Sequence, residues 1–211
     1  AAQHNRARMF AVLSATNEAI LRSTSEQDLY QDVCNAAVDG GKFLGTAIFL
    51  IEDDSSWFRM AAGAGPFVHL IEQLRFSSDA TIPHGQGLGG EAFRTARPCI
   101  SSDVLNDPRT QPWKELAASA GLTASAVLPL LRDGQADKTL ADSPIPIRSG
   151  AGLPLLRNGE AVGVLLFLSS ETDVFTPEFM KLLGRLADNV SFAMEMLERR
   201  SEERRVGKEC R

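Results

Sequence analysis

The strongest nucleophiles in this sequence are three thiols, on Cys34, Cys99 and Cys210. A reactive thiol needs a neighbour that lowers its pKa, or a second thiol that can resolve a disulfide. The three positions follow no metal-ligand or disulfide spacing, which indicates a reducing, cytoplasmic environment. Cys99 lies between Pro98 and Ile100. A free cysteine in such a strand usually packs as a small hydrophobic residue.

Two histidines are candidates for haem or ligand contacts. His84 directly precedes a glycine-rich loop, and His69 lies between Val68 and Leu70 in a short helical segment. A lone histidine in a loop is more often a polar surface residue than a ligand. Because neither has a His, Cys or Asp partner at metal-ligand spacing, we predict no metal site.

The glycine-rich stretch over 85–90 precedes a predicted helix over 91–95. Backbone N–H groups at such a helix start can cradle a phosphate. No Lys-Ser/Thr pair follows, as a P-loop requires, and no Rossmann βαβ unit surrounds it. We therefore interpret the stretch as a tight turn that lets the helix approach the sheet.

A polar cluster of Asp103, Asp107 and Arg109 follows a predicted strand over 98–104. Asp and Asn residues beside a proline usually cap turns, so a ligand-facing Asp103 is only one reading. No Ser-His-Asp or paired-carboxylate arrangement follows from the spacing.

Apolar periodicity predicts the elements that must position these groups. The predicted helices cover 9–21, 25–41, 66–76, 91–95, 113–120 and 176–199, and the predicted strands cover 46–51, 57–62, 98–104, 125–131 and 161–169. This order predicts an α+β fold, with an antiparallel sheet between helices. The last helix carries a narrow seam of the coiled-coil kind, formed by Phe179, Leu182, Leu186, Val190, Ala193 and Leu197.

Charge and hydropathy exclude two classes of partner. The net charge of -5 argues against nucleic-acid binding, which normally uses a basic face. No stretch of the sequence is long and apolar enough to span a membrane.

Two segments raise questions about the sequence itself. The stretch LPLLRDG at 128–134 is echoed by LPLLRNG at 153–159, and either copy could form a hairpin with 161–169. The residues between them, 135–152, are either a genuine insertion or an assembly artefact. The end of the chain, 200–211, resembles the in-frame translation of a sequencing adapter. On this hypothesis it is a non-native tail, and Cys210 has no function.

Four stretches together resemble the GAF domain family. They read GGKFLGTAIFLIED, IPHGQGLGGEAFRTARPCISSDVLNDPR, LPLLRNGEAVGVLLFLSS and FTPEFMKLLGRLADNVSFAME. The resemblance runs from Leu13 to Leu197. It is strongest to GAF domains of bacterial signalling proteins, upstream of GGDEF diguanylate cyclase or histidine kinase modules.

The resemblance implies a central antiparallel sheet of about six strands. The first and last helices would cover one face and form a homodimer, and short helices and loops would cover a ligand pocket on the other. It implies an N-terminal signalling helix over 1–22, a GAF domain over 23–175 and a coiled-coil-like helix over 176–199. The predicted pocket residues are Phe58, Phe67, Ile71, Phe76, Phe93, Cys99, Asp103 and Trp113. Plain core packing is expected to account for about half of them.

The function implied is that of a non-catalytic sensor, which binds an unidentified small molecule or relays a conformational change to an attached output domain. We predict no cofactor. Haem and bilin stay open as less favoured alternatives, since neither Cys99-Ile100 nor Cys34-Asn35 matches the Cys-His pair of bilin-binding relatives. Ser169-Ser170 and Phe179-Met180 depart from the pattern of cyclic-nucleotide binders. A free-methionine-sulfoxide reductase using Cys99 and a ligand-free dimerisation spacer are the two alternatives.

Overall fold

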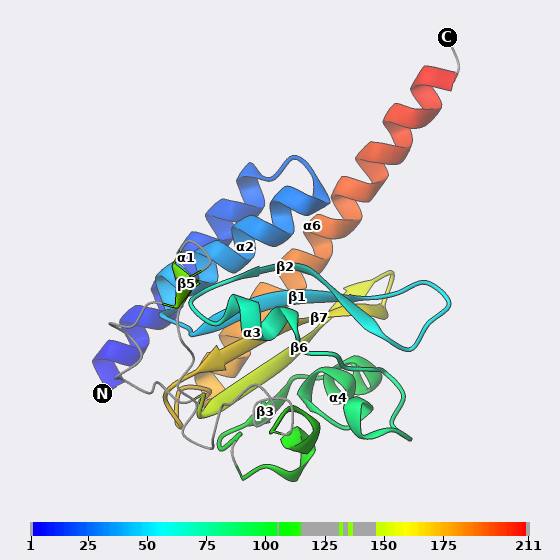
Figure 1. Ribbon diagram of the computed structural model, residues 1–211. Coiled ribbons are helices and arrows are strands. Elements are labelled where there is room, and N and C mark those ends of the chain that lie inside the picture. The colour runs from blue at the N-terminus through cyan, green and yellow to red at the C-terminus, as the bar shows by residue number, and fades with distance from the viewer. Residues whose placement is uncertain (1, 105, 115–130, 133–134, 137–146, 210–211) are drawn as a thin grey trace.

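The computed structural model describes residues 2–104, 106–114, 131–132, 135–136 and 147–209 (Figure 1). The helices are α1 (Ala2–Arg22), α2 (Glu26–Gly41), α3 (Val68–Glu72), α4 (Leu88–Thr95) and α6 (Pro177–Glu209), with 3-10 turns η1 (Pro83–Gly85) and η2 (Pro108–Thr110). The strands are β1 (Gly45–Ile51), β2 (Phe58–Ala64), β3 (Cys99–Ser101), β4 (Leu131–Arg132), β5 (Gln135–Ala136), β6 (Ser149–Arg157) and β7 (Glu160–Ser169).

The main sheet has five strands in the order β2-β1-β7-β6-β3, and every neighbouring pair is antiparallel. The predicted α+β class with a central antiparallel sheet is confirmed, and its five strands are close to the expected six. Strands β4 and β5 pair separately as a short ribbon.

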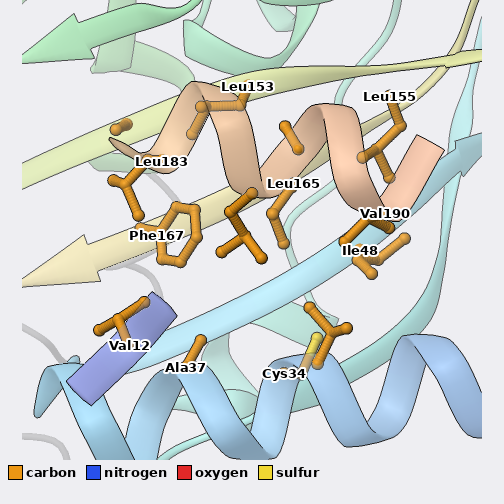
Figure 2. Close-up of a cluster of buried hydrophobic side chains, with 14 of the residues drawn as sticks. Val12, Cys34, Ala37, Ile48, Leu153, Leu155, Leu165, Phe167, Leu183 and Val190 are labelled. Atoms are coloured by element: carbon orange, nitrogen blue, oxygen red, sulfur yellow. The ribbon is translucent and has the colours of Figure 1, made fainter. Parts of the chain in front are cut away.

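Helices cover both faces of the sheet, as Figure 1 shows: α1, α2 and α6 lie on one face, with α3 and α4 toward the other. Each face has its own hydrophobic cluster. The helix-side core, part of which Figure 2 shows, includes Val12, Cys34, Ile48, Leu153, Phe167, Leu183 and Val190. The loop-side core lies under α3, α4 and the loops, and it contains most of the predicted pocket residues.

Side-chain caps start two of the helices, and a tight turn joins the last two strands of the main sheet. The Ser25 side chain accepts a hydrogen bond from the Asp28 backbone N–H at the start of α2. Thr176 Oγ1 accepts one from the Phe179 backbone N–H, at 3.2 Å, at the start of α6. Asn158 and Gly159 have positive φ angles of 52° and 84° and form the tight turn between β6 and β7.

Glycine just past a helix C-terminus commonly ends the helix, but the glycine pair at the end of α2 has a different role. Gly40 and Gly41 are still helical, and the left-handed residue is Lys42, whose N–H bonds to the Val38 carbonyl. A Cβ on Gly40 would lie 2.8 Å from the backbone carbonyl carbon of Ala11 in α1. The glycine is therefore needed for the close approach of α1 and α2.

Several element boundaries differ from prediction. Helix α4 begins at Leu88 rather than at 91, because the extended Gly87 is its N-cap. Helix α3 covers only part of the predicted 66–76, and β3 covers only part of 98–104. Residues 149–152, the end of the predicted insertion, pair with β7 as the first part of β6.

The seam predicted on the last helix faces the chain's own sheet. Phe179, Leu186 and Val190 are fully buried in the helix-side core. The large apolar side chains that remain exposed on the two outer helices are others, namely Phe10 and Leu21 on α1 and Phe192 and Val206 on α6.

Some predictions lie outside the described residues. These are most of the strand predicted over 125–131, the helix predicted over 113–120 beyond residue 114, most of the repeat over 128–134, and Cys210. Among the described helices, none carries an apolar stretch of the length that a bilayer crossing requires.

Candidate functional site

The loop-side core gathers six of the eight predicted pocket residues. Phe58, Ile71, Phe76 and Cys99 are buried in it, and Phe93 and Trp113 pack against it partly buried. They come from β2, α3, the loop after α3, α4, β3 and the helical residues 111–114 that follow η2, so the fold brings together segments that are far apart in the sequence.

The aromatic rings of this core pack directly on one another. Phe58 and Phe76 are stacked with ring centroids 4.5 Å apart, and Phe93 meets Phe58 edge-on at 5.0 Å. Phe49 of β1, which was not predicted, meets Phe76 edge-on at 4.7 Å. Such pairs add stability beyond that of area burial, so these rings form packed core in this structure.

Phe67 and Asp103 lie apart from the other predicted residues. Phe67 is buried at the start of α3, where its N–H bonds to the Leu44 carbonyl, but it is not part of the loop-side core. Asp103 is exposed in the loop after β3 and accepts a hydrogen bond from Asn106 Nδ2 at 2.6 Å. This hydrogen bond is typical of an Asp that caps a turn.

Arg109 is the polar centre at the rim of the loop-side core. Its guanidinium donates to Asp107 Oδ2 at 2.7 Å, to Glu91 Oε2 at 2.9 Å and to the Ile100 carbonyl at 2.9 Å. It thereby joins η2, α4 and β3. Its hydrogen bonds lower the pKa of Asp107 to about 2, so the carboxylate stays ionised.

The Cys99 thiol lies in this rim. Its Sγ is 3.1 Å from Arg109 Nη1. Burial nevertheless raises the pKa of Cys99 to about 11; the Arg109 charge opposes the shift, and Glu91 adds to it. The thiol is therefore protonated at neutral pH, and a protonated thiol is a poor nucleophile.

The second described thiol is on the opposite face of the sheet. Cys34 lies in the helix-side core, as Figure 2 shows, and burial raises its pKa to about 12. Because the sheet lies between the two cores, Cys34 is not placed to resolve a disulfide with Cys99.

Two tryptophans flank His84. Its ring lies 5.8 Å from Trp57 and 6.4 Å from Trp113, measured between centroids. Trp113 also covers Gly87 at the start of α4, where any Cβ would meet its ring at 2.1 Å. Within the described ranges, no group of three or more His, Cys, Asp or Glu side chains is placed to hold a metal ion.

The contact between Glu91 and Arg109 was not predicted. The sequence places these residues 18 positions apart, and no motif links them. The only available signal was the polar cluster that contains Arg109. Its partner on α4 depends on how the helix packs over β3, which the sequence pattern does not specify.

Comparisons with known proteins agree with this fold. The GAF domain family model matches residues 23–141 and 135–195, so the chain belongs to the GAF domain family. The match has two segments, and they overlap within the stretch between the two repeated copies. A search of curated proteins finds no match.

Several solved structures are similar in fold. The free methionine-R-sulfoxide reductase from Neisseria meningitidis aligns with a TM-score of 0.62 and 18% identity, over 92% of this chain and 91% of that one. The nlh2 GAF domain from A. aeolicus aligns with a TM-score of 0.62 and 12% identity, over 91% and 98%. The GAF domain of a phosphoenolpyruvate-protein phosphotransferase from Coxiella burnetii aligns with a TM-score of 0.60 and 16% identity, over 93% and 96%. At these identities the likeness establishes the fold alone.

Proposed function

We propose that this GAF domain is a non-catalytic sensory module of a bacterial signal-transduction protein. It binds a small molecule on the loop side, or relays a conformational change, and passes the result to an attached output domain such as a diguanylate cyclase or a histidine kinase. The two buried cysteines suit a cytoplasmic location.

The observation that carries this proposal is the course of α6. Its residues from Phe179 to Met194 pack into the helix-side core, residues 195–198 are only partly buried, and Arg199 is exposed where the helix extends away from the sheet (Figure 1). A helix that is fixed to a sheet at one end transmits displacements of that sheet to whatever follows it.

A homodimer through α1 and α6 is part of the proposal. The two helices lie against each other, with Asn189 Nδ2 donating to Asn17 Oδ1 at 3.2 Å. Their outer surface exposes Phe10, Leu21 and Phe192, each more than half accessible. Large exposed apolar side chains on neighbouring helices favour burial against a second copy.

The alternative is a free-methionine-sulfoxide reductase, because solved structures of that activity share this fold. The raised pKa of Cys99 and the position of Cys34 argue against it. An NADPH-coupled assay with thioredoxin and free methionine sulfoxide tests it. We expect no turnover with either wild type or Cys99→Ser. Turnover in wild type that is lost in Cys99→Ser would establish the reductase and refute the proposal.

A ligand-free spacer is the remaining alternative. A spacer binds no ligand, whereas a sensor does. Two measurements separate them: the thermal shift on adding nucleotides, haem or bilin, and native mass spectrometry of the purified chain. A retained or added molecule that raises the melting temperature supports the ligand-binding form of the proposal. No bound molecule and no shift in melting temperature would favour the ligand-free spacer over the ligand-binding form of the proposal.

A further inference from the structure

The turn between β6 and β7 is attached to α6 by side chains from one face of that helix. The Leu156 backbone N–H donates to Ser191 Oγ at 2.9 Å, and the Asn158 backbone N–H donates to Glu195 Oε1 at 2.8 Å. Arg157 Nε lies 3.2 Å from Glu198 Oε2, an ion pair without hydrogen-bond geometry. Ser191, Glu195 and Glu198 are spaced by four and three residues, so they lie on one helix face.

An irregularity in the sheet lies at the first of these contacts. The register shifts between Leu155, which pairs with Gly163, and Leu156, which pairs with Ala161. A bulge of this kind interrupts the ladder and redirects backbone groups. Here the interruption falls at the residue whose N–H donates to the Ser191 hydroxyl.

Arg157 links the same turn to α2. Its Nη2 donates to Glu26 Oε1 at 2.7 Å, and Glu26 Oε2 accepts a hydrogen bond from Tyr30 Oη at 3.1 Å. The side chains of Arg157, Glu26 and Glu198 are all partly buried, being 27–39% exposed. The turn is therefore held between two helices, and α6 contributes three of the side chains.

The other end of β6 contacts the rim of the candidate site. Gly150 to Gly152 pair with β3, and Arg109 binds the Ile100 carbonyl of β3. One strand thus connects the Arg109 rim on the loop side with the turn that contacts α6.

We propose that the β6–β7 turn is the point at which the sheet sets the position of the C-terminal half of α6, with Ser191, Glu195 and Glu198 as positioning residues. A displacement of β6 on the loop side moves the turn, and the turn carries α6 with it. The signalling meaning of this attachment rests on the proposed function, since α6 is the connection to the output domain.

The test measures the position of α6 relative to α2. Spin labels are placed at Asp32→Cys and Arg199→Cys, both exposed positions, in a chain whose native cysteines are replaced by serine or alanine. Double electron–electron resonance then gives the distance distribution between them. We expect a narrow distribution in this parent, and a broadened or displaced one when Ser191→Ala and Glu195→Ala are combined.

Conservative and control variants make the result specific. Glu195→Gln keeps an oxygen that accepts from the Asn158 N–H, so it should retain the parent distribution, as should Asp188→Asn at an exposed position of the same helix. Amide exchange at Asn158 should be about tenfold faster in Glu195→Ala. If the double variant does not fold, Glu195→Ala alone is measured.

An unchanged distribution in the folded alanine variant would overturn the inference. The measurement involves no ligand and no output domain, so its result is independent of the assays that test the proposed function. A reductase activity would refute that function and leave the attachment of α6 intact.

Discussion

At the residue scale, Arg109 is the side chain on which the loop-side rim most depends. Replacing it by methionine leaves Asp107 and Glu91 without their cation and frees the Ile100 carbonyl at the edge of β3. We expect a loss of about 2 kcal/mol in the free energy of unfolding, measured by urea titration. Arg97→Met, at an exposed position in the turn after α4, is the control and should cost under about 0.5 kcal/mol. Equal losses in the free energy of unfolding for the two substitutions would show that the Arg109 contacts do not stabilise the fold.

The Asp107 carboxylate makes the stability of the folded chain depend on pH, and the sign of this dependence follows from its lowered pKa. Its pKa is about 2 in the folded chain, mainly because Arg109 donates to it, against about 3.9 in an unfolded chain. The stability that it contributes is therefore fully present above about pH 4 and is lost as the pH falls toward 2. We expect the stability difference between wild type and Asp107→Asn to shrink across that window in thermal or urea unfolding. A difference that is constant from pH 5 to pH 2.5 would contradict the assigned pairing.

At the scale of elements, replacing glycine by alanine should have opposite effects on stability in two helices. A Cβ on Gly40 of α2 meets the backbone of α1 at 2.8 Å, whereas a Cβ on Gly184 of α6 meets nothing within 4 Å. We expect Gly40→Ala to destabilise the chain by about 1–3 kcal/mol through this clash. Gly184→Ala should stabilise it by about 0.5–1 kcal/mol through helix propensity. Unfolding titrations of both variants check the pair, and a stabilising Gly40→Ala would refute the close approach of α1 and α2.

Local features of the elements could be predicted from the sequence, whereas contacts between distant elements could not. Ser25, Thr176 and the Asn158-Gly159 turn were predictable because each acts within a few residues of itself. The periodic seam of α6 was visible, but periodicity does not say which surface covers it, and the sheet proved to do so. The Arg109–Glu91 contact and the attachment of α6 to the β6–β7 turn join residues 18 to 41 positions apart, so only the folded packing reveals them.

At the scale of the whole molecule, the proposed homodimer should depend on the exposed side chains and not on the buried seam. Combining Phe10→Glu with Phe192→Glu places charges at two positions that are each 65% exposed. We expect a folded monomer by sedimentation equilibrium where wild type is a dimer, while the exposed control Lys181→Glu stays dimeric. A wild type that is monomeric at high concentration, or a double variant that still dimerises, would remove this interface.

The central claim is that this GAF domain works as the input module of a larger signalling chain. Sequencing the intact gene through 128–159 and well past Arg199 tests it most directly. The account predicts that the native reading frame past Arg199 differs from the adapter-like stretch at 200–211 and continues into a catalytic output domain. A native stop codon directly after the last helix would contradict it.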